Sequence, residues 1–176
     1  MVGECSKIDK QDNELKNLHK MITLITATTP THYQTAANLF QEYAAQLNVD
    51  LSFQNFGQEL KTMKTQYALP KGILYLVNDK QENAVGCFGI RAFEGDICEL
   101  KRMYLKTSFR GKGIGKLLLA KAIEVGKSLG YYKMRLDTLP NMISAITLYQ
   151  KMGFYEIEPY RFNPIEGTKY FEVELI

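Results

Sequence analysis

Along the chain, segments in which hydrophobic and polar residues follow the period of a strand alternate with segments that follow the period of a helix. This pattern predicts a mixed α/β architecture. Short β-branched or alternating runs, typical of strands, occupy residues 22–26, 73–77, 84–93, 96–105, 132–138, 154–160 and 168–176. Apolar residues at helical spacing predict four helices in the segments 31–47, 53–67, 113–129 and 140–152. The order is one strand, two helices, three strands in an antiparallel meander, and then β-α-β-α-β-β. It predicts one α/β domain with a mixed central sheet.

Composition places the chain in an ordinary globular class. Its 176 residues are 45% hydrophobic and 23% charged, enough for one domain with a core. The formal net charge of +3 does not by itself indicate a nucleic-acid partner. No apolar run approaches the ~20 residues of a membrane helix, and residues 1–20 are polar and aperiodic, without a signal-peptide core. We therefore expect a flexible tail over 1–20, a compact domain over 21–176 and a cytoplasmic location.

Cysteine and histidine are too sparse to predict a metal site, a disulfide framework or a catalytic triad. The cysteines Cys5, Cys87 and Cys98 are widely spaced and contain no CxxC pair. The two histidines, His19 and His32, both lie in the first fifth of the chain. The expectation is a protein without a bound metal.

The stretch RGKGIG, residues 110–115, carries three glycines at alternate positions just where a helix is expected to begin. It is not a P-loop, since Arg110 and Leu117 stand where Gly and Ser or Thr are required. It is not a Rossmann fingerprint, since Lys116 replaces the third glycine. Free N–H groups and the positive dipole end of a first helical turn favour an anion, and bare glycines let a phosphate approach them. The pattern therefore indicates a pyrophosphate site, with a plain turn as the alternative.

The glycine stretch lies in a run of positive charge. Residues 101–121 contain seven basic side chains and no acidic one. A nucleic-acid face and an ordinary solvated helix face are both compatible with this run. No aromatic residues alternate with these cations as in single-strand binding, which disfavours the nucleic-acid reading.

Three motifs in order resemble the GNAT superfamily of acyl-CoA N-acyltransferases. The loop at 110–115 matches the pattern Q/R-x-x-G-x-G/A of that family, ELKRMYL (99–105) resembles its fourth strand, and LYQKMGF (148–154) resembles its second signature. The resemblance covers residues 21–176. It implies the GNAT fold, a mixed, mostly antiparallel sheet of six to seven strands flanked by about four helices, and acetyl-CoA as co-substrate.

The resemblance also implies which residues bind the cofactor. Backbone groups of the fourth strand would pair with the pantetheine arm, and the glycine loop would hold the pyrophosphate. Asn141 would reach the pantetheine from the next helix. The implied cofactor-binding residues are Met103, Tyr104, Leu105, Arg110, Gly111, Lys112, Gly113, Ile114, Gly115, Lys116 and Asn141.

Two residues are candidates for catalysis. Tyr149 in the second signature would protonate the departing thiolate; its alternative is a core aromatic. Glu99 is the candidate base, with a structural ion pair to Lys101 or a neighbouring cation as the equal alternative. Strand alternation puts Glu99 on one face with Lys101, Met103 and Leu105 if no bulge intervenes.

Fewer sequence signals mark the part of the site that would bind the acetyl acceptor. Its walls are expected from Tyr33, Phe53 and Phe56 in the first two helices and from the loop before the last strand. The predicted substrate-binding residues are Phe53, Tyr160, Arg161 and Asn163. Arg161 could clamp the carboxylate of an amino-acid-like acceptor, or be an ordinary surface arginine.

Together these features predict an acetyl-CoA-dependent N-acetyltransferase that acts by direct attack of a primary amine in a ternary complex. A small-molecule acceptor is preferred, with no nucleic-acid or membrane partner, and a homodimer is the default expectation. A non-catalytic acyl-CoA sensor and a protein N-acetyltransferase are the alternatives. The presence of both Glu99 and Tyr149 disfavours the sensor.

Overall fold

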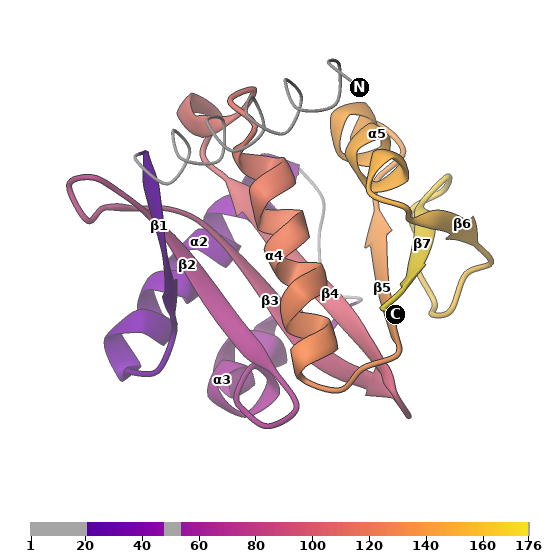
Figure 1. Cartoon of the computed structure of the whole chain (residues 1–176), viewed down its shortest axis with the longest axis horizontal. Coiled ribbons are helices and arrows are strands. Elements are labelled where there is room, and N and C mark those ends of the chain that lie inside the picture. The colour runs from indigo at the N-terminus through magenta and orange to yellow at the C-terminus, as the bar shows by residue number, and fades with distance from the viewer. Residues whose placement is uncertain (1–20, 48–53, 176) are drawn as a thin grey trace, which may run out of the picture.

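A seven-stranded sheet runs through the whole molecule and carries helices on both faces (Figure 1). The computed structural model describes residues 21–47 and 54–175. The tail expected over 1–20 and the predicted acceptor residue Phe53 lie outside these residues. No helix in the described ranges is both long enough and apolar enough to cross a membrane.

The elements follow the predicted order closely. The strands are β1 (Ile22–Thr26), β2 (Ile73–Asp79), β3 (Ala84–Glu94), β4 (Ile97–Leu105), β5 (Lys133–Thr138), β6 (Tyr155–Ile157) and β7 (Lys169–Glu174). The helices are α2 (Pro30–Leu47), α3 (Phe56–Gln66), α4 (Ile114–Ser128) and α5 (Ile143–Lys151), with a 3-10 turn η2 (Thr107–Phe109) before α4. The predicted mixed sheet with about four flanking helices is confirmed.

The strand order in the sheet is β1-β2-β3-β4-β5-β7-β6. All neighbours are antiparallel except β4 and β5, which run parallel because α4 connects them across one face. That face carries α4, whereas α2 and α3 cover the opposite face (Figure 1).

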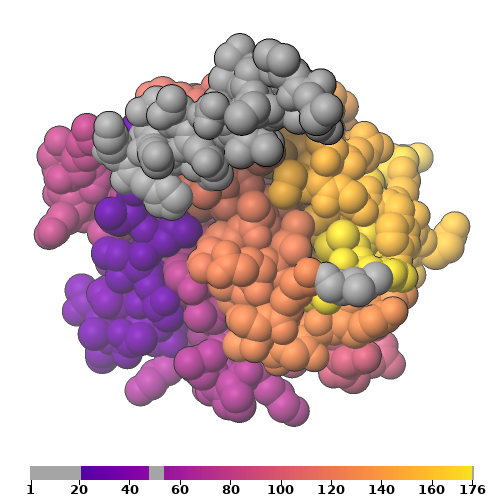
Figure 2. Space-filling model, viewed as in Figure 1, coloured from indigo at the N-terminus to yellow at the C-terminus, as the bar shows by residue number. Residues whose placement is uncertain are grey.

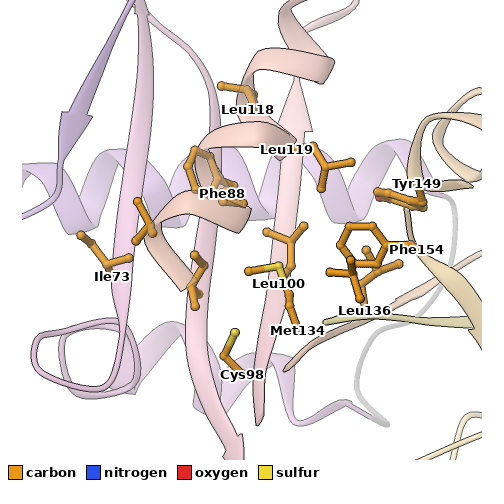
Figure 3. Close-up of a cluster of buried hydrophobic side chains, with 14 of the residues drawn as sticks. Ile73, Phe88, Cys98, Leu100, Leu118, Leu119, Met134, Leu136, Tyr149 and Phe154 are labelled. Carbon is orange, nitrogen blue, oxygen red and sulfur yellow. The ribbon is translucent and has the colours of Figure 1, made fainter. Parts of the chain in front are cut away.

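Each face of the sheet has its own hydrophobic core. On the α4 face, Leu118 and Leu119 pack against Phe88 and Leu100 of the central strands (Figure 3). The space-filling view shows α4 covering the middle of this face (Figure 2). On the other face, Phe40 of α2 packs edge-on against the buried ring that follows α3, with ring centroids 6.0 Å apart. The central strands are thus buried on both sides.

A β-bulge divides β4 into two parts. The segment of β4 from Lys101 to Tyr104 spans three residue steps, whereas the segment of β3 that pairs with it spans only two. Arg102, inside this segment, has φ +54°. Before the bulge Glu99 and Lys101 face α3; after it Met103 and Leu105 pack in the α4-side core. The expectation that all four share one face is therefore wrong, because the bulge reverses the alternation.

Buried charge holds the bulge in place. The guanidinium of Arg102 lies 2.6 Å from Oε2 of Glu59 on α3, and Tyr67 donates a hydrogen bond to Oε1 of Glu59. Burial alone would raise the pKa of Glu59, but the charge and hydrogen bonds of Arg102 outweigh it and lower that pKa. Both side chains are nearly inaccessible, so each charge depends on the other.

We expect Glu59→Gln to lower the free energy of unfolding by about 3 kcal/mol, because it leaves the Arg102 charge buried without its counter-ion. Chemical denaturation followed by circular dichroism measures this loss. Glu124→Gln, which removes an exposed partner of Lys121, is the matched control and should change stability by less than about 1 kcal/mol. Equal effects of the two substitutions would contradict a structural role for the Glu59–Arg102 pair.

Candidate active site

A groove opens where β4 and β5 separate. The two strands pair only at Ile97–Lys133, Cys98–Met134 and Glu99–Arg135, and then diverge. The β4–α5 groove that results has a volume of about 630 Å³. Met103, Tyr104 and Leu105 line one side, and Asn141 and Tyr149 line the other. The structure thus brings five of the predicted site residues together.

The glycine loop closes one end of this groove. Gly111 and Gly113 have φ of +72° and +81°, which favours glycine, and α4 starts directly afterwards. Among the described residues, the backbone N–H groups of 111–115 have no hydrogen-bond partner. Ile114 is fully buried in the core, so only its backbone can reach a ligand. The loop therefore presents a cluster of free donors to the groove.

The basic side chains of the loop differ in their contacts and in their exposure to solvent. Arg110 lines the groove, but its guanidinium donates to the Leu105 carbonyl and to Gln46 of α2, both at 2.8 Å. Lys112 and Lys116 are exposed, and Nζ of Lys112 lies 5.4 Å from the Phe109 ring centroid. The two lysines are thus free to approach an anion at the loop, whereas Arg110 also links α2 to the end of β4.

Tyr149 belongs to both the core and the groove. Its ring lies beside that of Phe154, with centroids 5.9 Å apart (Figure 3). The Phe171 ring is its other neighbour, with centroids 6.1 Å apart. Burial, with the nearby charges of Tyr43 and Asp137, raises the pKa of Tyr149. The phenol therefore stays protonated at neutral pH and can donate a proton into the groove.

Glu99 is fully buried at the centre of a charged cluster. Its carboxylate accepts hydrogen bonds from Nε and Nη2 of Arg91, at 3.0 and 2.9 Å, and from the Tyr160 hydroxyl, at 3.0 Å. Arg161 forms a further ion pair with it, and Nζ of Lys101 lies 3.9 Å away. The predicted residues Glu99, Tyr160 and Arg161 thus meet, but the carboxylate is already occupied by donors.

A small cavity borders both this cluster and the β4–α5 groove. The connecting cavity, about 50 Å³, is lined by Lys101, Asp137, Gln54 and the predicted residue Asn163, and shares Tyr43 with the β4–α5 groove. Asp137 lies 3.3 Å from Nζ of Lys101 and accepts a hydrogen bond of 3.1 Å from Gln54. Burial lowers the pKa of Lys101 to about 8.

On the other side of Glu99 lies a larger cavity of about 660 Å³. Lys71, Arg91 and Arg161 line it and, within the described ranges, no acidic side chain does. We call it the cationic cavity. Gln54 borders both it and the connecting cavity, so the two are neighbours.

Arg91 and Asp137 belong to the site but were not predicted from the sequence. A signal was present, because both are charged residues on strands expected to be central in the sheet. Their neighbours could not be read from the sequence, because strand pairing places Arg91 opposite Glu99.

The described residues contain no group of three or more His, Cys, Asp or Glu side chains arranged to hold a metal ion. The donors in the groove and cavities are instead backbone N–H groups, arginines and lysines. These groups suit anionic and carbonyl ligands.

Comparison with known proteins identifies the family of the chain. The sequence model of the acetyltransferase (GNAT) family matches residues 33–154. A Schizosaccharomyces pombe protein named an uncharacterized N-acetyltransferase is 36% identical, over 88% of this chain and 95% of its own. Human N-acetylaspartate synthetase is 34% identical, over 54% of this chain and 32% of its own.

Solved structures show the same fold. A GNAT-family acetyltransferase from Staphylococcus aureus Mu50 superposes with a TM-score of 0.72 at 24% identity, over 88% of this chain and 99% of its own. A GNAT-family acetyltransferase from Elizabethkingia anophelis, solved with acetyl-CoA bound, gives a TM-score of 0.61 at 25% identity, over 87% of this chain and 97% of its own. Acetyl-CoA is the co-substrate of this family. The family match, the relatives and the fold together show that this chain belongs to the GNAT family of acetyltransferases and is an acyltransferase enzyme.

Proposed function

We propose that the protein transfers the acetyl group of acetyl-CoA to the primary amine of a small molecule, by direct attack in a ternary complex. One observation carries the proposal. The separation of β4 from β5 creates a groove that combines free N–H groups, a strand without a neighbour on one side, and a buried tyrosine hydroxyl.

The groove supplies each part of an acetyl-CoA site. The free N–H groups of the 111–115 loop and the start of α4 would bind the pyrophosphate, with Lys112 and Lys116 close by. Backbone groups of Met103, Tyr104 and Leu105 would pair with the pantetheine arm, and Asn141 would contact it from the opposite wall.

The chemistry follows from this placement. The neutral amine attacks the thioester carbonyl, the tetrahedral oxyanion collapses, and the C–S bond breaks to release the thiolate. Tyr149 would give its proton to that thiolate. A cysteine intermediate is disfavoured, because burial raises the pKa of Cys98 to about 12 and also raises the pKa of Cys87.

The proton of the attacking amine has two candidate acceptors. Glu99 is the one that the sequence predicts, but its oxygens already accept from Arg91 and Tyr160. Asp137 lies in the connecting cavity, next to the β4–α5 groove, and its contacts with Gln54 and Lys101 are longer. This position favours Asp137 as the base and Glu99 as a residue that positions the arginines around it.

The small-molecule preference has support from the relatives. Several are named N-acetylaspartate synthetase, a name that specifies a single amino acid as the acetylated group. The alternatives, an acyl-CoA sensor and a protein N-acetyltransferase, are tested below. The homodimer and the cytoplasmic location stay predictions.

The first test is a thiol-release assay with acetyl-CoA and a panel of amino acids, polyamines, aminoglycosides and peptides. We expect turnover with small amines, and Tyr149→Phe should lower kcat by about 10²-fold or more because the thiolate leaves without a proton donor. Tight CoA binding without turnover on any amine would favour the sensor, and turnover on peptides alone would favour a protein acetyltransferase. An undiminished kcat in Tyr149→Phe would remove Tyr149 as the acid.

The loop can be tested with two matched glycine substitutions. Gly111→Ala and Gly130→Ala both add a methyl group at positive φ, +72° and +84°, with no atom within 4 Å. Both should cost about 1 kcal/mol of stability. Only Gly111→Ala should also weaken acetyl-CoA binding severalfold in calorimetry, because Gly111 lines the groove. Equal affinities of the two variants would argue against pyrophosphate binding at the loop.

The base can be assigned from the steady-state kinetics of Asp137→Asn and Glu99→Gln. We expect Asp137→Asn to lower kcat by about 10²-fold, because the attacking amine loses the acceptor of its proton. Glu99→Gln should keep kcat and mainly raise the KM of the acceptor. The reverse pattern would identify Glu99 as the base.

A further inference from the structure

We propose that the acceptor is a small amino acid whose carboxylate binds Arg91 and Arg161 in the cationic cavity, with its amine on the side of Gln54, where this cavity borders the connecting cavity. This inference rests on the proposed function and specifies its substrate class. Four observations carry it: the charge balance, the free donors, the order of the cavities and the separation from the cofactor groove.

The charges around Glu99 do not balance. Arg91, Arg161 and Lys101 face only two carboxylates, those of Glu99 and Asp137. The exposed fractions of these five side chains range from 0% for Glu99 to 21% for Arg91, so water compensates the extra positive charge only in part. Burial and the charge of Arg91 lower the pKa of Arg161 to about 10. One further anion would neutralise the cluster.

Arg161 still has a donor for that anion. Arg161 pairs with Glu99 through Nη2, and its buried Nε has no hydrogen-bond partner among the described residues. Its guanidinium lies over the rings of Tyr160 and Phe93, 5.0 and 5.8 Å from their centroids. Arg91 is fixed between Glu99 and Gln66, which accepts a 2.6 Å hydrogen bond from it. Two preorganised planar guanidinium groups suit a planar carboxylate.

The order of the cavities sets the orientation of the acceptor. Gln54 lines both the cationic cavity and the connecting cavity, and Tyr43 lines both the connecting cavity and the β4–α5 groove, so the three spaces lie in this order. With its carboxylate at Arg161, the acceptor would have its amine on the side of Gln54 and Asp137. Their oxygen atoms are acceptors that suit an ammonium group before it loses its proton.

The cavity is separate from the predicted phosphate site. The cationic cavity and the β4–α5 groove have no lining residue in common, and the glycine loop belongs to the groove alone. The cations of the cavity thus have no cofactor phosphate to neutralise them, so the anion must come from the acceptor.

The test compares each amino acid with its own amide. Glycine, L-alanine, β-alanine, L-aspartate and L-glutamate are assayed for acetyl transfer beside the amides in which the carboxylate is replaced. An amide keeps the size and the amine and removes the carboxylate charge; because it also makes the amine less basic, acid and amide are compared at equal concentrations of the neutral amine. We expect kcat/KM to be about ten to a hundred times higher for the acids, the range of a charged hydrogen-bonded pair.

Substitutions of the cations at the cavity test whether they cause the difference between acids and amides. Arg161→Gln and Arg91→Gln should bring the ratio of acid to amide close to one. Lys71 is an exposed residue that lines the cavity, and Lys71→Gln should reduce the ratio of acid to amide severalfold. This variant still tests the proposal if an arginine variant does not fold. Lys127→Gln removes a positive charge from α4, on the opposite face of the sheet, and should leave the ratio unchanged.

The outcomes separate this inference from the proposed function. Transfer to acids and amides with equal efficiency would overturn the carboxylate site and leave the acetyltransferase standing. If no amine is acetylated, the proposed function fails, and calorimetric titration with glutarate decides about the site. Glutarate binding that Arg161→Gln abolishes would support it, and absence of binding would overturn it.

Discussion

The early separation of β4 from β5 is the constraint on which the site depends. A parallel pair normally continues its hydrogen-bond ladder, and here the ladder stops after Glu99. The backbone of β4 beyond this point has a neighbour in β3 but none in β5. The bulge at Arg102 turns β4 at the same place, and Glu59 holds the bulge from α3. The part of β4 that has no partner in β5 thus forms the floor of the β4–α5 groove.

The buried polar cluster around Glu99 fixes specific contacts on the face of the sheet that α2 and α3 cover. Glu99 links Arg91 of β3 with Tyr160 and Arg161 of the loop before β7. A hydrophobic residue at this position would avoid the cost of burying a charge. The carboxylate instead fixes two guanidinium groups and anchors the loop before β7 against the sheet.

Much of the fold could be predicted from the sequence, because the elements are strongly periodic. Every predicted strand and helix is present, and the glycine loop, Tyr149 and Asn141 meet in one groove as the family motifs imply. The predicted alternation along β4 failed at Arg102, because a bulge leaves no mark in the hydrophobic pattern. Arg91 and Asp137 were missed for another reason. Their importance comes from strand register and from a loop distant in the sequence, and periodicity describes neither.

The connecting cavity has a consequence for the shape of molecules that can react. At about 50 Å³ it is more than ten times smaller than the cationic cavity and the β4–α5 groove, the two spaces with which it shares lining residues. If the acceptor amine reaches the thioester by this route, any further group on the reacting nitrogen would meet Tyr43, Lys101 and Gln54. The protein would then select its acceptor by the size of the reacting amine as well as by the charge at the far end.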